Sequence, residues 1–282
     1  MVFKSKDLIE NMTDAPNRVQ VDWSLVVAAN SDQILRSNLL ANSESAAAKE
    51  VLIQKDALSA AHAYNRGLQE STGEIVVFAH QDVFLPPGWH RRFSRAIMEL
   101  SRRDPNWGVA GLYGVKRSGR GVGYAYSTGL RRFVGQEFSS PTHVRTLDEI
   151  MLVVRRKSGL SFDPDLPGFH LYGTDICLEA EARGMKNYVL PCFALHNSAG
   201  LKYLPLDFWK AYIYLRRKWI TRLPIVTPCT KITRCCMPMF KDILYCGFLR
   251  PFRDHNSGSR VSDPARLYAE NLMQIVNKRE KN

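Results

Sequence analysis

Short apolar runs alternate with longer amphipathic stretches over the first hundred residues of the chain. Three runs are apolar and bounded by polar residues, as expected of strands that are buried on both faces: 23–29, 51–54 and 74–79. Helical patterns predict one helix capped by Ser31, one over 59–68 and one from Pro86 to about Arg103. This alternation predicts an α/β fold with a parallel, doubly wound sheet.

The pattern changes after this first part. Residues 107–160 are rich in glycine, arginine and β-branched residues, which predicts short strands and loops that add an antiparallel part to the sheet. Next come a predicted helix from near Thr174 to Gly184, a strand at 188–190, and a basic, aromatic, amphipathic helix over 203–220. The chain is therefore expected to combine parallel and antiparallel strands in one mixed sheet.

Three parts of the chain differ in character. Residues 1–20 are polar and are expected to be flexible, and residues 21–202 carry the α/β pattern. Residues 203–282 form a helical, basic C-terminal extension, with a last helix expected near 264–278.

The composition is that of a globular protein with a basic surface. A hydrophobic fraction of 45% suffices for a packed core and excludes a disordered chain. The formal net charge of +12 favours anionic partners such as nucleotide phosphates, nucleic acid or an anionic membrane. No motif supports nucleic-acid binding. We find no secretory signal and no stretch of about 18 apolar residues, so we expect a cytoplasmic location.

The six cysteines do not form a disulfide framework in a chain of this length. Cys177 and Cys192 lie in apolar patterns and are expected to be buried thiols. The remaining four cluster without CxxC spacing, which favours reduced thiols over a zinc site: Cys229, Cys235, Cys236 and Cys246.

Polar residues follow the third predicted strand as His80-Gln81-Asp82. Ligands of doubly wound sheets bind at the carboxyl ends of the strands, so these side chains are expected in the ligand crevice. The carboxylate of Asp82, together with phosphate oxygens and water, suits a divalent cation. From position alone, a plain turn aspartate is an equally good interpretation.

Two further polar positions follow later elements. Asp175 lies at a predicted helix N-terminus, where it is either a cap, the better interpretation from this segment alone, or a general base for an acceptor hydroxyl. His196 follows the last core strand, and beside Asp82 it becomes a credible metal ligand. A shell of Asp, His and phosphate favours Mn²⁺ over Mg²⁺.

Residues 63–67 (AYNRG) form a small-residue stretch that lets the chain approach a nucleotide closely, with Arg66 in reach of a phosphate. Ordinary packing of that helix explains the same residues equally well.

Two segments give the chain a resemblance to a known family: SAAHAYNRGLQESTGEIVVFAHQDVFLPPGW and FDPDLPGFHLYGTDICLEAEARGMKNYVLPCFALHNS. They resemble inverting family 2 glycosyltransferases of the GT-A fold, which is a Rossmann-like, doubly wound mixed sheet. The similarity is greatest to the branch named after a streptomycin-biosynthesis protein, which has an HQD motif, and it spans about residues 23–200. This branch suggests polysaccharide or secondary-metabolite biosynthesis.

The resemblance implies roles for individual residues. His80-Gln81-Asp82 takes the place of the DxD motif, with Asp82 as the metal-binding carboxylate and His80 where the first Asp usually stands. Asp175 matches the catalytic base, preceded by Thr174 in place of the usual Glu, and His196 matches a late metal-binding histidine. Seven residues are expected at the nucleotide sugar: Ala29, Asn30, Asp56, Asn65, Arg66, His80 and Gln81.

The implied mechanism is a single displacement with inversion. A divalent metal neutralises the leaving diphosphate, and Arg66, Lys116 or Arg117 adds positive charge. Asp175 deprotonates the acceptor, a glycan or a small molecule with a hydroxyl group. Three residues are candidates for the acceptor side, although packing is the better interpretation for each: Trp89, His170 and Tyr172.

Three alternatives stay open at this point. The altered DxD motif leaves room for a catalytically impaired GT-A-like module that binds a nucleotide or glycan. A nucleotidyltransferase ranks lower, because no glycine-rich basic loop follows the first strand. The helix over 203–220 either rests on an anionic membrane surface or packs on the domain, and packing is favoured.

Overall fold

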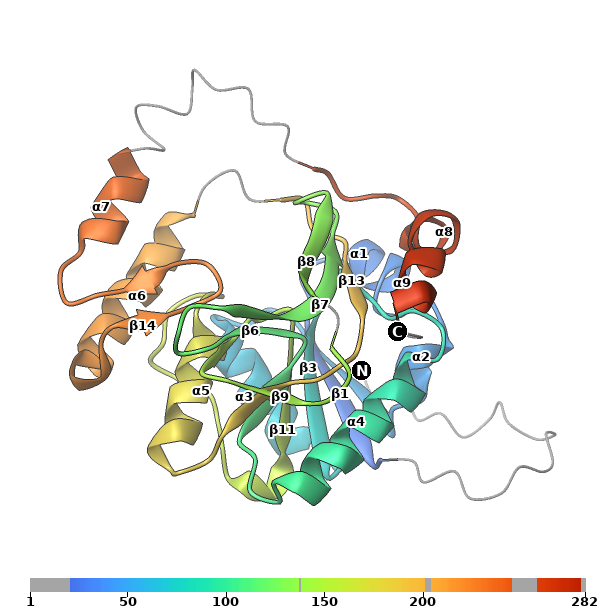
Figure 1. Cartoon of the computed structure of the whole chain (residues 1–282), viewed down its shortest axis with the longest axis horizontal. Coiled ribbons are helices and arrows are strands. Elements are labelled where there is room, and N and C mark those ends of the chain that lie inside the picture. Colours follow the sequence, from blue (N-terminus) through green and yellow to red (C-terminus); the bar gives the residue numbers. More distant parts are fainter. Residues whose placement is uncertain (1–20, 137, 201–203, 245–257, 280–282) are drawn as a thin grey trace.

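The computed structural model describes residues 21–136, 138–200, 204–244 and 258–279 (Figure 1). The segment 1–20, predicted to be flexible, lies outside these ranges, as does Cys246. Within them the chain forms two β-sheets, helices on both faces of the larger sheet, and a helical C-terminal part.

The larger sheet has seven strands in the order β2-β1-β3-β11-β5-β12-β9. Five strands run in one direction: β1 (Trp23–Ala28), β2 (Glu50–Gln54), β3 (Ile75–His80), β5 (Val109–Gly111) and β12 (Asn187–Val189). Two run against them: β11 (Met151–Arg155), between β3 and β5, and the edge strand β9 (Thr142–Val144). The predicted α/β fold with a mixed, doubly wound sheet is confirmed.

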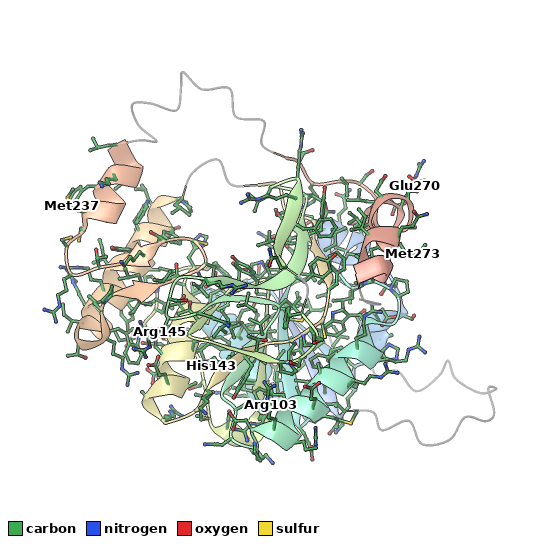
Figure 2. The ribbon with its side chains drawn as sticks, in the orientation of Figure 1. Arg103, His143, Arg145, Met237, Glu270 and Met273 are labelled. Carbon is green, nitrogen blue, oxygen red and sulfur yellow. The ribbon has the colours of Figure 1, made fainter. Side chains whose placement is uncertain are left out.

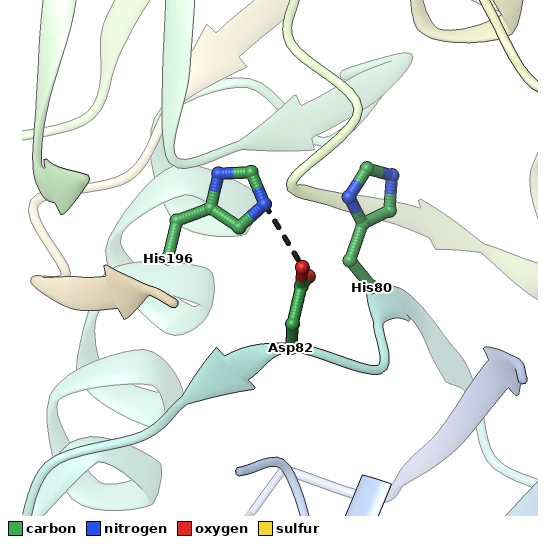
Figure 3. A group of neighbouring side chains, drawn as sticks. All are labelled: His80, Asp82 and His196. Carbon is green, nitrogen blue, oxygen red and sulfur yellow. Dashed lines mark ion pairs between the residues drawn. The ribbon is translucent and has the colours of Figure 1, made fainter. Parts of the chain in front are cut away.

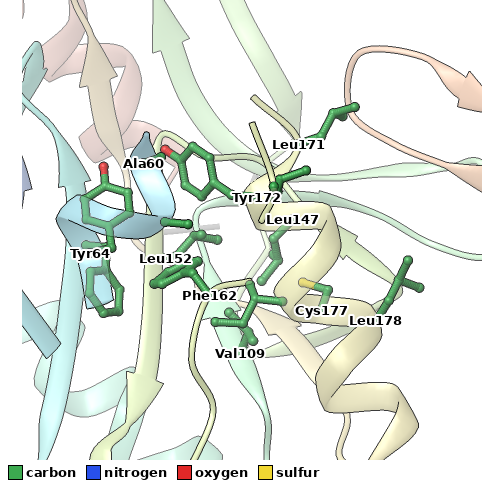
Figure 4. Close-up of a cluster of buried hydrophobic side chains, with 14 of the residues drawn as sticks. Ala60, Tyr64, Val109, Leu147, Leu152, Phe162, Leu171, Tyr172, Cys177 and Leu178 are labelled. Carbon is green, nitrogen blue, oxygen red and sulfur yellow. The ribbon is translucent and has the colours of Figure 1, made fainter. Parts of the chain in front are cut away.

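Alternating side chains of β1 build a core on each face of this sheet. Val26 packs with the helices α3 (Ala60–Glu70) and α5 (Tyr172–Ala182), in the cluster drawn in Figure 4. Leu25 and Val27 pack with α1 (Asp32–Ser37) and α4 (Trp89–Arg103) on the other face. The short helix α2 (Ser43–Ala46) precedes β2. Strands buried on both faces explain the continuous apolar runs in the sequence.

Side-chain caps confirm two of the predicted helix starts. The Ser31 hydroxyl accepts a hydrogen bond from the Ile34 amide, and the Ser59 hydroxyl accepts one from the His62 amide. Each cap satisfies a backbone donor that the first turn leaves unpaired.

The second sheet has the order β10-β6-β7-β13-β4, with β8 also paired to β7. Its strands are β4 (Val83–Phe84), β6 (Tyr113–Val115), β7 (Gly121–Ser127), β8 (Arg132–Gln136), β10 (Thr146–Leu147) and β13 (Ala194–His196). The pairing of His196 with Val83 brings the end of β13 next to the segment that follows β3.

The C-terminal part lies on two sides of the central sheet (Figure 1). On one side are α6 (Leu206–Lys218), the hairpin of β14 (Ile225–Val226) and β15 (Lys231–Ile232), and α7 (Met237–Leu244). On the other are α8 (Pro264–Leu267), a π-helix (Tyr268–Leu272) and α9 (Met273–Arg279). The described ranges also contain 3-10 turns at Arg156–Ser158 and Ile220–Arg222.

The aromatic face of α6 is buried. Phe208, Trp209 and Tyr212 belong to the core cluster that also contains residues of α3 and α5, so α6 packs on the domain as the favoured interpretation predicted. Cys177 and Cys192 are buried and form no disulfide, as predicted. None of the helices in the described ranges has both the length and the apolar character needed to cross a bilayer.

Candidate functional site

A cavity of about 460 Å³ opens at the carboxyl ends of β1, β2 and β3. Seven of the residues predicted from the sequence line it: Ala29, Asn30, Asp56, His80, Gln81, Asp82 and Tyr172. Ala28, Gln54, Ala57, Tyr64 and Phe169 complete the lining. Its position agrees with the rule that ligands bind at strand ends in such sheets.

His80 and Asp82 of the lining converge with His196, which lies outside the lining (Figure 3). One ligand atom from each lies within 4.8 Å of the others, and His196 Nε2 is 3.3 Å from Asp82 Oδ1. The Asn197 amide donates a 2.8 Å hydrogen bond to the Asp82 carbonyl, which fixes the end of β13 beside the segment after β3. Two imidazoles and one carboxylate form a donor set that fits a divalent transition-metal ion.

The three groups set one another's charge. Burial acts to raise the pKa of Asp82, but the hydrogen bond and charge of His196, with help from His80 and Arg260, hold that pKa well below its usual range. Burial acts to lower the pKa of His196, yet its bond to Asp82 leaves that pKa raised. Burial lowers the pKa of His80 against the charge of Asp82. Asp82 is thus an anion and His80 a neutral imidazole, the forms that bind a metal, whereas His196 would have to give up a proton to do so.

Gln81 joins the ends of β1 and β3. Its side-chain oxygen accepts hydrogen bonds of 3.1 Å from the amides of Asn30 and Ser31, and its nitrogen donates to Asn30 Oδ1 at 2.6 Å. Asn30 and Gln81 therefore form a fixed rim of the cavity.

Backbone strain marks two points beside the cavity. Asp56 has φ 55° and Leu171, the residue before α5, has φ 63°. Left-handed backbone at a leucine costs about 1–2 kcal/mol, and such strain clusters at ligand sites. At Leu171 it turns the chain so that Tyr172 enters the cavity.

We call His80, Asp82 and His196 the metal-ligand group. Tyr172 connects this group to Glu149, a buried acid that the sequence analysis missed. Its hydroxyl lies 2.9 Å from His80 Nε2, and the Gly173 amide donates to Glu149 Oε1 at 3.2 Å. Burial, together with the charge of Asp148, raises the pKa of Glu149 to about 8. An acidic pair inside the apolar stretch 146–154 was the signal available in the sequence.

Asp175 lies in the first turn of α5, buried and outside the cavity lining. Its two oxygens accept hydrogen bonds from Lys218 Nζ at 2.9 Å and Trp219 Nε1 at 2.7 Å. Lys218 also pairs with Asp163 and Glu179. Burial raises the pKa of Asp175 although Lys218 opposes that shift. The end of α6 therefore covers this carboxylate.

Trp89 was a candidate for the acceptor side, but the structure shows the packing role that the sequence analysis favoured for it. Its ring is fully buried, stacks on Phe93 at 4.9 Å and contacts Trp23. The indole is part of the core beneath α4 and has no surface to offer a sugar.

Other expected residues lie outside the cavity lining. Asn65 bonds to the Phe162 backbone, and Arg66 bonds to Gln54 and the Lys55 carbonyl. The ring of His170 packs edge-on against Phe208.

Lys116 and Arg117, expected to stabilise the leaving group, line a different cavity of about 450 Å³. That cavity also contains His143 and Arg145, which are labelled in Figure 2, and it adjoins the edge strand β9. Arg117 there pairs with Glu181 at 2.5 Å.

A second missed residue contacts the metal-ligand group directly. Arg260 Nη2 donates to Asp82 Oδ2 at 3.0 Å. The two residues are 178 positions apart, so no local pattern in the sequence links them.

Comparisons with known proteins give one family. The family model described as "Glycosyltransferase like family" matches residues 35–197. The protein "ATP synthase subunits region ORF 6" of Fuscovulum blasticum is 32% identical over 139 residues, which are 46% of this chain and 53% of that protein. The chain thus spans about half the length of this curated relative.

Solved structures show weaker similarity. GalNAc-T7 with UDP, GalNAc and Mn²⁺ gives a TM-score of 0.47 at 14% identity, covering 93% of this chain and 59% of that one. S. aureus TarS 1–349 with UDP-GlcNAc gives 0.46 at 14% identity, covering 71% and 67%. Mannosyltransferase PcManGT of Pyrobaculum calidifontis gives 0.44 at 13% identity, covering 83% and 72%.

Glu149 makes stability depend on pH. Its carboxyl ionises near 4.5 ordinarily but near 8 in the fold, so unfolding releases a proton between these values and stability is lost as pH rises through them. Between pH 5 and 8 we expect the wild type to lose on the order of 2–4 kcal/mol relative to Glu149→Gln. Urea unfolding at each pH, without metal, measures this difference. The exposed Glu74→Gln serves as control, and parallel stability curves for wild type and Glu149→Gln would contradict the assignment.

Proposed function

Because the chain belongs to the glycosyltransferase-like family, we propose that it transfers a sugar from a nucleoside-diphosphate donor to an acceptor hydroxyl with inversion. The observation that carries the proposal is the cluster of His80, Asp82 and His196, of which His80 and Asp82 line a cavity formed by strand ends. A glycan or small-molecule acceptor in polysaccharide or secondary-metabolite biosynthesis, in the cytoplasm, completes the proposal.

The donor occupies the 460 Å³ cavity in this proposal. Asn30 and Gln81 present fixed polar groups at its rim, and Asp56 is a candidate partner for the nucleoside. Arg66 and Asn65 support this wall from behind through Gln54 and Phe162.

Asp82, His196 and His80 would hold a divalent cation at the diphosphate. The cation would act as a Lewis acid that offsets the charge of the leaving group. Two imidazoles in the donor set favour Mn²⁺ over Mg²⁺. Tyr172, hydrogen-bonded to His80, orients this ring.

Asp175 is our proposal for the general base. Burial raises its pKa, which makes it a stronger base than an exposed aspartate, and it lies in the same helical turn as Tyr172 of the cavity. Since Lys218 and Trp219 occupy both of its oxygens, the acceptor hydroxyl has to displace the Lys218 ammonium to reach it.

The donor site predicts metal-dependent nucleotide binding. One nucleoside diphosphate at about 100 times its Kd should raise Tm by about 5 °C in Mn²⁺ and not in EDTA. Thermal unfolding with a panel of nucleoside diphosphates, each with Mn²⁺, Mg²⁺ or EDTA, measures this. Asp82→Ala should abolish the shift, whereas the exposed Asp165→Ala should keep it. No shift with any nucleotide would refute the donor site.

The base assignment predicts a selective loss of transfer. Asp175→Asn should lower kcat about 10²–10⁴-fold while nucleotide affinity stays unchanged. Asp163→Asn, which removes another carboxylate from Lys218, is the matched control and should retain most of the activity. Equal losses in both variants would show that Asp175 serves only to hold α6.

Membrane contact is the second part of the proposal, and we place it on α7 instead of α6. Residues 206–244 hold eight Lys and Arg against two Asp, a net of +6 and half of the charge of the chain. Four large apolar side chains of α7 are exposed: Met237, Phe240, Ile243 and Leu244. Met237 lies on the outer side of the helix (Figure 2). Exposed apolar groups among cations suit an anionic leaflet.

Flotation with vesicles tests this surface. The wild type should float with phosphatidylserine-containing vesicles, not with pure phosphatidylcholine, and high salt should release it. Phe240→Ser with Ile243→Ser should lower binding about tenfold or more, because it removes two exposed apolar side chains that the membrane would bury. Leu58→Ser, also highly exposed but outside α7, should bind as the wild type does. Absence of any binding would end this part of the proposal.

A further inference from the structure

We infer that Arg260 is the residue that binds the donor diphosphate, and that in the free protein its guanidinium takes the place of the cation at Asp82. The inference rests on the proposed function. Arg260 Nη2 lies 3.0 Å from Asp82 Oδ2, while His196 Nε2 lies 3.3 Å from Oδ1 of the same carboxylate. The guanidinium thus shares the carboxylate that the proposed metal would use.

The segment around Arg260 is fixed on the domain. We call residues 258–261 the C-terminal strap. The Gly258 amide donates to the Gly129 carbonyl at 3.0 Å, and the Val261 amide donates to Asn197 Oδ1 at 2.8 Å. Arg260 Nε donates to the Asn197 carbonyl at 2.9 Å. The strap is therefore tied to the residue that directly follows His196.

Two further features show that this path of the strap is specific. A Cβ on Gly258 would lie 1.8 Å from the Thr128 carbonyl oxygen, so only glycine passes there. Downstream, Tyr268 and Leu272 pack into a buried cluster with Phe84 and Phe193. The strap is thus held at both ends, with Arg260 between them.

The cavity needs a cation that its walls do not supply. Among the described residues, the lining contains neither lysine nor arginine. Lys116 and Arg117 line the other cavity, and Arg66 is engaged by Gln54 and Lys55. Arg260 is the cationic side chain bonded to the metal-ligand group in this part of the structure, and its side chain is 33% exposed.

The chemistry of the two partners favours an exchange. A cation on Asp82 repels the guanidinium and satisfies the carboxylate, which removes the reason for the Arg260–Asp82 pair. A guanidinium donates two parallel hydrogen bonds to phosphate oxygens and keeps its charge at any working pH. Arg260 therefore opposes metal binding in the absence of nucleotide and supports nucleotide binding once the metal is bound.

These two effects have opposite signs, so they separate this role from a structural one. In Arg260→Ala we expect Mn²⁺ alone to bind several-fold more tightly, because a competing cation is gone. The same variant should bind the nucleoside diphosphate about tenfold more weakly at saturating Mn²⁺, the loss expected for one charged hydrogen-bonding partner. The parent nucleoside, which has no phosphate, should bind both proteins equally.

The experiment measures free Mn²⁺ by electron paramagnetic resonance and nucleotide affinity by calorimetry. The nucleotide is the diphosphate that stabilises the wild type most. Arg266→Ala, an exposed arginine of α8 paired with Glu270, is the control and should change neither affinity. Arg260→Lys keeps the charge without the planar fork, so it should restore part of the nucleotide affinity and tests the inference if Arg260→Ala does not fold.

The outcomes are distinguishable. Unchanged nucleotide affinity in Arg260→Ala, or weaker binding of Mn²⁺ alone, would overturn the inference while the donor site stands. Absence of nucleotide binding by the wild type would overturn both this inference and the proposed function.

Discussion

The buried charge of Asp82 is the constraint around which the site is organised. A carboxylate taken out of water is stable only if neighbours compensate its charge and fill its lone pairs. His196 and Arg260 bond to its two oxygens, and they come from the end of β13 and from the strap. Segments that are more than a hundred residues apart in the chain are thus brought together by one side chain. The same negative charge is what a divalent cation would bind.

The surroundings of Asp82 keep the remaining groups neutral or occupied. His80 is a neutral imidazole oriented by Tyr172, and Glu149, whose pKa is about 8, holds its proton at neutral pH. Asp175 shares Lys218 with two other carboxylates and lies outside the cavity lining. The structure therefore has a charge-compensated carboxylate, Asp82, at the cavity edge and a second carboxylate, Asp175, that the end of α6 covers. A metal-dependent donor step and a separately gated acceptor step are consistent with this arrangement.

The local pattern of apolar and polar residues was sufficient to predict which residues lie at the strand ends. It was not sufficient to predict which residues later segments bring to the site. The apolar runs that become β1, β2 and β3 predicted the strand ends, and with them Asn30, His80 and Asp82 in the cavity. Position in a helix says less about how deeply a side chain is buried, so Trp89 was a candidate for the acceptor side although it lies in the core. Lys116 and Arg117 were expected near the leaving group but line the other cavity. Composition does not reveal where β11 enters the sheet or which path β9 takes, so the sequence could not exclude this. The contact between Arg260 of the strap and Asp82 joins residues that are 178 positions apart, and hydrophobic periodicity carries no information about such a contact.

Release of nucleoside diphosphate from a sugar nucleotide tests the central claim most directly. The purified protein is incubated with a set of sugar nucleotides and Mn²⁺, without acceptor, and the products are separated by mass spectrometry. The account predicts slow hydrolysis of one donor by water, abolished by EDTA and by His196→Ala. A protein that binds a nucleoside diphosphate but consumes no donor, with or without added acceptor sugars, would contradict it and indicate a binding module.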